Sequence, residues 1–180
     1  MNAFLTGTLR RIEDSKGAPY LAVVIEGDLT LLDRGWAHLA TLGLDSAVAA
    51  RHARDGADNA HVTIAGVAEW GGLIKYKAEV AQAAERFLGV PVEMELHGIG
   101  KATAQKHPNT AWYGILSCDA MATLRADLGM RPKDFHVTLA FEPKDVFDSA
   151  KDLATLVVPL AQIAQLPVEP NAYDSGPNPC

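Results

Sequence analysis

Cysteine is scarce in this chain: of 180 residues only two are cysteines, Cys118 and Cys180. They form neither a disulfide framework nor a C-x-x-C zinc spacing, which suits a reducing compartment. Long apolar runs are missing too, since none approaches the roughly 18 residues that a membrane span needs. The first residues lack the basic-then-apolar order of a secretory signal. We therefore expect a cytoplasmic protein with no membrane partner.

Positive charge is also in short supply. Lysine and arginine total 16 against 22 aspartate and glutamate residues, which gives a net charge of -6 and a pI near 5.4. Proteins that hold long nucleic acids do so through many phosphate contacts from a basic surface. A pocket with a few local donors can hold one or two phosphates whatever the overall charge. The balance favours small nucleotides over long duplexes as partners and leaves the oligomeric state open.

Hydrophobic residues, in contrast, make up 48% of the chain, enough to build the core of one compact domain. Strand and helix patterns follow in the same order in both halves: strand, turn, strand, helix, polar break, strand. Outside two short words the halves hardly match in sequence, which indicates two related α+β lobes and not a solenoid. The expected strands span residues 3–12, 20–26, 61–66, 90–101, 111–118 and 135–141, and the expected helices span 29–42, 45–54 and 120–128.

A linking helix is expected between the lobes. Residues 73–88 are rich in alanine, carry apolar side chains at helical intervals and follow a Gly-Gly break. The last residues, 167–180, are rich in Pro, Asn and Gly and are expected to be irregular. The predicted domain therefore spans residues 1–166, with two lobes that share a core.

The two matching words are HVTI, which begins at His61, and HVTL, which begins at His136. Successive side chains of a strand point to opposite faces, so His61 and Thr63 share one face about 6 to 7 Å apart. The same holds for His136 and Thr138. Each word thus offers one imidazole and one hydroxyl on a polar face, while its apolar residues point into the core.

This set of side chains suits chemistry on a phosphodiester. Displacement at phosphorus needs a base for the nucleophile and an acid for the leaving oxygen, and histidine takes either part near neutral pH. Threonine hydroxyls can donate to the non-bridging oxygens. The two words do not reveal which histidine is the base. No cofactor or metal is required by this chemistry.

The same words allow two other interpretations. A single H-x-T word is typical of any amphipathic strand, but two copies at the end of matching units favour a shared function. Two histidines could also bind zinc, but zinc sites usually need a third protein ligand, and no HExxH or similar spacing occurs.

With these two words the sequence resembles the 2H phosphoesterases, a superfamily defined by two H-h-[ST]-h motifs, in which h is an apolar residue. The resemblance implies a bilobal α+β fold with a central cleft between two pseudo-symmetric antiparallel sheets and outer helices. It also implies metal-independent cleavage or ligation of phosphodiesters. By direct match, His61, Thr63, His136 and Thr138 take the catalytic positions.

Within that superfamily, residues 124–148, LRADLGMRPKDFHVTLAFEPKDVFD, are similar to phage anti-CBASS nucleases, which destroy the cyclic oligonucleotide signals of bacterial antiviral immunity. This similarity implies small cyclic or linear oligonucleotides as substrates, in a bacterial or phage-infected host cytoplasm. The alternative enzyme is an RNA-end processing 2′,3′-cyclic phosphodiesterase or 2′-5′ RNA ligase-like protein. A nucleotide-binding module without turnover is a further alternative.

Substrate-binding candidates lie near the words. Tyr20 and Trp70 are candidates for stacking on bases, with core packing as the alternative for the latter. Lys133 and Lys144 flank the second word and could neutralise a phosphate, although a solvated lysine is the more common case. His97, on a polar strand face, is either an exposed residue or a third histidine of the site.

Overall fold

The computed structural model describes residues 3–57 and 59–166. The predicted irregular tail 167–180, with Cys180, lies outside this part of the chain. The strands of the described part are β1 (Ala3–Glu13), β2 (Pro19–Ile25), β3 (His61–Ala65), β4 (Pro91–Thr103), β5 (Thr110–Ser117), β6 (Phe135–Glu142) and β7 (Leu156–Pro159). The helices are α1 (Thr30–Thr41), α2 (Asp45–Asp55), α3 (Val67–Tyr76), α4 (Ala78–Glu85), α5 (Asp119–Asp127) and α6 (Leu160–Ile163), with a 3-10 turn at Leu153–Thr155.

The strands form one antiparallel sheet in the order β1-β2-β3-β6-β5-β4-β7, and β1 also pairs with β4. The first three strands come from one half of the chain and the other four from the second half. The halves meet at the pair Val62–Val137 between β3 and β6, and again along β1 and β4. The α+β class is confirmed, and the two expected sheets are joined into a single one.

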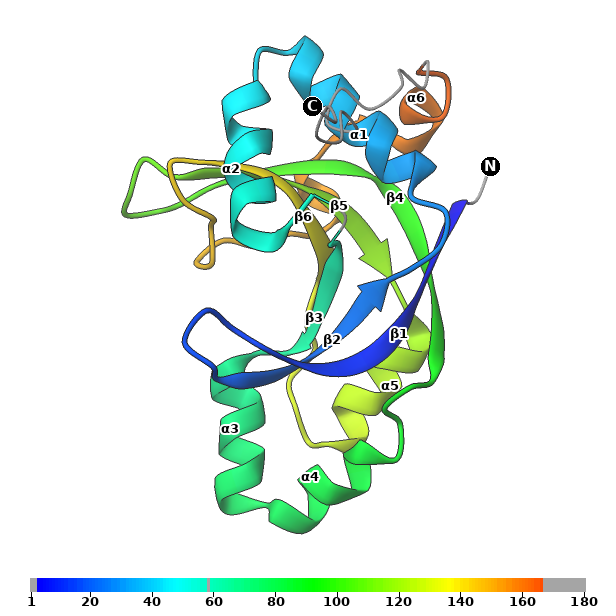
Figure 1. Cartoon of the computed structure of the whole chain (residues 1–180), viewed down its shortest axis with the longest axis vertical. Coiled ribbons are helices and arrows are strands. Elements are labelled where there is room, and N and C mark those ends of the chain that lie inside the picture. Colours follow the sequence, from blue (N-terminus) through cyan, green and yellow to red (C-terminus); the bar gives the residue numbers. More distant parts are fainter. Residues whose placement is uncertain (1–2, 58, 167–180) are drawn as a thin grey trace, which may run out of the picture.

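The helices gather at two ends of the molecule (Figure 1). Helices α1, α2 and α6 lie at one end, and α3, α4 and α5 lie at the other, with the strands between them. Both α1 and α2 pack against β6, α3 packs against β2, and α5 reaches β3. No helix within the described part of the chain is long and apolar enough to cross a membrane.

The expected helix 29–42 shows how the local pattern builds an element. Leu32, Trp36 and Leu39 recur at helical spacing and are all buried in α1. The chain then turns at Gly43, whose φ of 77° lies in the left-handed region that glycine adopts without strain. Trp36 ties α1 to the second lobe, because its indole N–H donates to the backbone oxygen of Leu139 at 3.2 Å.

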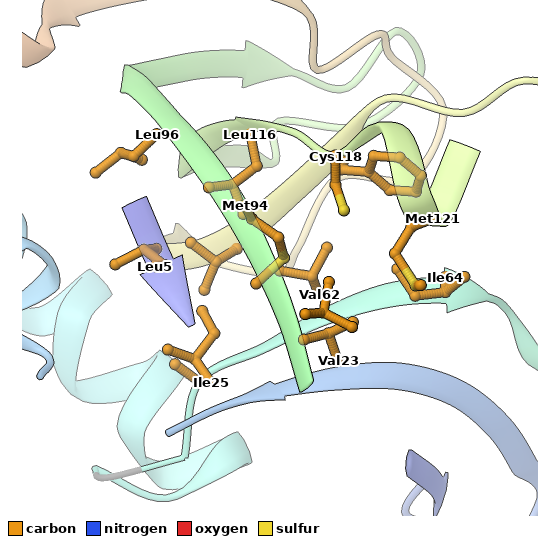
Figure 2. Close-up of a cluster of buried hydrophobic side chains, with 14 of the residues drawn as sticks. Leu5, Val23, Ile25, Val62, Ile64, Met94, Leu96, Leu116, Cys118 and Met121 are labelled. Atoms are coloured by element: carbon orange, nitrogen blue, oxygen red, sulfur yellow. The ribbon is translucent and has the colours of Figure 1, made fainter. Parts of the chain in front are cut away.

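The hydrophobic core packs on the inner face of the sheet and includes the apolar residues of both H-x-T words. Val62 and Ile64 of β3 are 0% exposed and point into a cluster with Met94 and Met121 (Figure 2). Val137 of β6 is 1% exposed and belongs to the same cluster. Because the apolar face is buried, the opposite face of β3 and β6 must point toward the surface. A shift of the strand register by one residue would turn the polar side chains into the core.

The prediction of one linking helix over 73–88 is wrong in its bounds. Two helices occupy this region, and the first begins at Val67 and runs through Gly71 and Gly72. Glycine in a helix costs only about 1 kcal/mol relative to alanine, and burial of Trp70 and Leu73 in the core outweighs that cost. The backbone breaks at Lys77, so that α4 packs separately through its own buried alanines.

The segment after β6 carries structure that the sequence pattern did not predict. It contains the 3-10 turn, strand β7 and helix α6, and β7 pairs with β4 at the edge of the sheet. Between Pro143 and Asp152 the chain is irregular and returns to the polar face of β6, where Asp145 and Lys151 are 8% and 5% exposed. This return brings two charged side chains into contact with the second H-x-T word.

Candidate active site

The pairing of β3 with β6 brings the two words side by side. Val62 is the partner of Val137 in this antiparallel pair. Continued by one residue in each direction, this register sets His61 opposite Thr138 and Thr63 opposite His136. The two histidines are then diagonal neighbours, which lie about 7 to 8 Å apart in a regular antiparallel pair. One phosphate group fits between imidazoles at that separation.

All four side chains lie on the face opposite the core. Each of His61, Thr63, His136 and Thr138 is partly exposed, while the valine between each pair is buried. The polar faces predicted from the alternation are therefore present, and the register makes them one face.

Strand β5 extends this face on the side of β6. Tyr113 is the partner of Thr138, and Ile115 is the partner of His136. The Tyr113 ring stands edge-on to the His136 ring, with centroids 5.6 Å apart, and its hydroxyl donates to Oγ1 of Thr155 at 2.8 Å. The His136 ring is thus held against a buried aromatic wall.

His61 contacts a neutral side chain, Tyr20. Tyr20 Oη lies 3.3 Å from Nε2 of His61, and the two rings meet edge to face at 6.0 Å. The structure therefore places the predicted Tyr20 beside the array, although its hydroxyl contacts the histidine directly. Burial lowers the pKa of His61, and the nearby Asp55 carboxylate opposes that shift.

His136 contacts a charged side chain, Lys151. Nζ of Lys151 lies 3.2 Å from Nε2 of His136, and Nδ1 of the same ring lies 3.4 Å from the backbone oxygen of Asp134. An ammonium only donates, so these contacts select the tautomer with hydrogen on Nδ1 and the lone pair on Nε2. Burial, followed by the Lys151 charge, lowers the pKa of His136 to about 3.

Asp145 joins this lysine to the rest of the array. Its carboxylate accepts from Lys151 Nζ at 3.2 Å, from Arg54 Nη1 at 2.8 Å and from Thr138 Oγ1 at 3.3 Å. Arg54 also donates twice to Asp55 at 2.7 Å. Burial alone would raise the pKa of Asp145, but the two cations outweigh burial and lower it. The carboxylate is therefore ionised, and it balances the buried charge of Lys151.

The two predicted lysines differ in their positions. Lys133 is partly buried and close enough to the site that its charge acts on His136. Burial lowers its pKa, while the Glu69 carboxylate opposes that shift. Lys144 is exposed in the turn after β6, next to Asp145. The position of Lys133 thus supports a phosphate contact, whereas such a contact by Lys144 stays a prediction.

The predicted stacking role of Trp70 requires a correction. Its side chain is 0% exposed and belongs to the main hydrophobic core. It lies on α3, which begins directly after β3, and the helix turns this residue inward together with Leu73. A ring without exposed surface cannot stack on a base, so core packing is the correct interpretation.

Sequence reasoning missed Arg54, Asp145 and Lys151. Asp145 lies within the stretch 124–148 that carries the resemblance, so the signal was present, but its neighbour Lys144 was selected instead. Lys151 follows in an irregular segment with no periodic pattern, and only the tertiary fold brings it to His136. A lysine that far from a motif carries no local signal.

Within residues 3–57 and 59–166, no group of three or more His, Cys, Asp or Glu side chains is arranged to hold a metal ion. The lone pair of His136 Nε2 faces an ammonium, which is an environment that repels a cation.

A comparison with known protein families agrees with this geometry. A family model described as "2H-SAK: Swiss Army Knife, 2H phosphoesterase domain" matches residues 31–147, which are more than half of the chain and include both words. The search of curated proteins and the search of solved structures returned no match. The chain therefore belongs to the Swiss Army Knife group of 2H phosphoesterase domains and is a hydrolase of the two-histidine type.

Proposed function

We propose that this phosphoesterase hydrolyses phosphodiester bonds of small nucleotides without a metal ion, and that its substrates are cyclic oligonucleotide immune signals such as cyclic di- and trinucleotides. The observation that carries the proposal is the register of β3 and β6, which sets two imidazoles diagonally across one exposed face. A phosphate between them would have one proton acceptor and one proton donor on opposite sides, as in-line displacement requires.

The contacts of the histidines support a division of labour. His136 is neutral and has its lone pair on Nε2. It serves as the base once Lys151 turns from that nitrogen to a phosphate oxygen and the phosphate anion raises the pKa of the ring. For His61 the strongest neighbouring charge is the Asp55 carboxylate, which favours the protonated ring. A bound phosphate anion raises the pKa of both rings, and His61 takes up the proton first and serves as the acid.

Hydroxyls and an ammonium would stabilise the transferring phosphoryl group. Thr63 and Thr138 stand beside the histidines on the same face, and Lys151 supplies a positive charge that is already desolvated. The hydroxyl of Thr138 donates to Asp145 in this structure, so it would have to rotate toward a phosphate oxygen. The array then offers donors to the charge that develops on the non-bridging oxygens.

The nucleophile depends on the substrate. For a linkage with a free ribose 2′-OH, His136 would take the proton of that hydroxyl, whose oxygen attacks phosphorus while the bond to the 5′-oxygen breaks. For a cyclic phosphate, His136 would take a proton from water in the same way. In both cases His61 gives its proton to the leaving oxygen, and the 2′-OH route yields a 2′,3′-cyclic phosphate. The step leaves His136 protonated and His61 neutral, so His136 then releases a proton to solvent and His61 takes one up to restore the starting state.

The preference for small substrates rests on charge. Two cations near the histidines, Arg54 and Lys151, are paired with Asp55 and Asp145. These pairs leave little net positive charge to attract a long phosphate backbone, and the net charge of the chain is -6. The similarity of residues 124–148 to anti-CBASS nucleases points to cyclic oligonucleotides in particular. RNA-end processing is the alternative.

A substrate panel tests the proposal. The protein in EDTA is incubated with cyclic di- and trinucleotides, 2′-5′ oligoadenylate and RNA that ends in a 2′,3′-cyclic phosphate, and products are separated by chromatography. We expect cleavage of the cyclic oligonucleotides at the highest rate. Faster turnover of the RNA end would favour the alternative. If all substrates emerge unchanged, or if turnover needs added metal, the proposed function fails.

A further inference from the structure

A pocket of about 400 Å³ lies next to the catalytic array, at the end of β5 and the start of β6. It is large enough for a nucleoside, since pockets for small ligands begin at roughly 300 Å³. Part of its wall, residues 151–154, comes from beyond the segment that matches the family model.

The pocket is continuous with the His136 side of the array. Ile115, which lines it, is the strand partner of His136, and Lys151 both lines it and contacts Nε2 of that histidine. Ser117 follows Ile115 by two residues and lies on the same face. These shared residues place the pocket directly beside His136, so a ligand whose phosphate sits at the histidines can extend into it.

Two polar side chains face each other in the wall. His97 Nε2 lies 2.9 Å from Oγ of Ser117, and the bulge in the β4–β5 pairing between Leu96 and Gly98 brings this histidine to that position. An imidazole and a hydroxyl can each donate or accept, so together they can read one edge of a heterocycle. The sequence leaves open whether His97 belongs to the site or is simply exposed. The structure places it in the wall of this pocket.

The remaining lining is mixed. Apolar surface comes from Leu116, Phe135 and Leu153, and the last of these is 59% exposed at the rim. Such walls suit the faces of a flat ring, which loses little hydration when it is buried.

The charges of the pocket argue against a second phosphate. Three carboxylates line it, from Asp119, Asp134 and Asp152, against the two ammonium groups of Lys133 and Lys151. Lys151 is already paired with Asp145. Carboxylates repel a phosphate but accept hydrogen bonds from ring N–H and exocyclic amino groups.

We propose that this pocket binds the base of the nucleotide on the His136 side of the scissile phosphate, and that it prefers bases with an exocyclic amino group, namely guanine, adenine and cytosine. The placement of the phosphate rests on the proposed function, whereas the binding of the base does not require turnover. The polar contacts come from His97 and Ser117 and from the carboxylates at the rim.

Binding measurements separate this inference from catalysis. The full chain in EDTA is titrated by calorimetry with GMP, AMP, CMP, UMP, ribose 5-phosphate and inorganic phosphate. The three nucleotides with amino groups should bind about tenfold or more tightly than ribose 5-phosphate, and UMP should fall between them. The variants His97→Ala and Ser117→Ala should lose most of this difference. His107→Ala, an exposed histidine in the β4–β5 turn, is the matched control and should bind as the wild type does.

Each outcome decides the matter. Equal affinity for ribose 5-phosphate and the nucleotides overturns the inference, and so does base-dependent affinity that neither wall variant changes. Because Ser117 is exposed, its truncation should leave the fold intact and keeps the test valid if the His97 variant fails to fold. Base-dependent binding without cleavage of any substrate would support the pocket and reject the proposed phosphodiesterase function, and cleavage without base-dependent binding would do the reverse.

Discussion

Nζ of Lys151 lies 3.2 Å from Nε2 of His136, and the lysine is 5% exposed. A buried ammonium next to an imidazole keeps that imidazole neutral and turns its lone pair toward the charge. Asp145 makes the arrangement stable, because its carboxylate binds the same ammonium at 3.2 Å. We therefore assign Lys151 two tasks: it sets the state of His136, and it donates to a phosphate oxygen when substrate binds.

Replacement of Lys151 by methionine tests this assignment. Loss of one donor to the developing charge should lower kcat by about 100-fold. Because the Lys151 charge lowers the pKa of His136, that pKa should rise in the variant, which an NMR titration of the ring measures directly. Lys106→Met, in the exposed β4–β5 turn, should change neither quantity. A kcat loss without any change in the His136 pKa would mean that Lys151 only supports the fold.

The pH dependence of kcat/KM tests the roles of the two histidines. His136, with its pKa lowered to about 3, is in the base form throughout the usable range. His61 must carry a proton to act as the acid, and burial lowers its pKa from an ordinary value of about 6.5. Fewer molecules carry that proton as pH rises, so kcat/KM should be about tenfold or more higher at pH 5.5 than at pH 8. A profile that rises toward alkaline pH would contradict this assignment.

Some of this site was predictable from the sequence and some was not. The words at His61 and His136 were predictable because alternation in a strand fixes which side chains share a face. Lys151 was not, since an irregular segment of the chain returns it to β6 and no periodic pattern marks that return. For Trp70 the sequence leaves stacking and core packing open, because the direction of an aromatic side chain after a strand is set only by the helix that carries it.

The same limit applies to the fold. Apolar spacing predicted helix α1 because Leu32, Trp36 and Leu39 can only meet the core as one stripe. Local propensity misjudged the helix 73–88, because Gly71 and Gly72 stop a helix only when no buried neighbours hold it. The joining of the two expected sheets depends on the pair Val62–Val137 and on the pairing of β1 with β4, which no local pattern encodes.

Another buried cation, Arg125, connects α5 to α3 and β3. Arg125 of α5 donates to Glu69 of α3 at 2.7 Å and also to the backbone oxygen of Ile64 in β3. Its side chain is 3% exposed. Arg125→Met should lower the free energy of unfolding by about 3 kcal/mol, because Glu69 and the backbone oxygen lose their donor.

The exposed pair Arg11–Glu85 offers the control for this measurement. Its side chains are 52% and 46% exposed, and Arg11→Met should cost less than about 1 kcal/mol. Chemical denaturation of both variants gives the comparison. Equal losses would show that the Arg125 contacts do not hold the two helices to the strand.

The measurement that tests the central claim most directly is the single-turnover cleavage rate in EDTA, with the best substrate of the panel, for the wild type, His61→Ala and His136→Ala. Circular dichroism confirms that each variant is folded. We predict that the wild type cleaves without metal, that each single variant is slower by about 1000-fold or more, and that the double variant is little slower still, because the two imidazoles act as a unit. A wild type that cleaves only with added metal, or a folded single variant that keeps nearly full activity, would contradict the two-histidine site on β3 and β6.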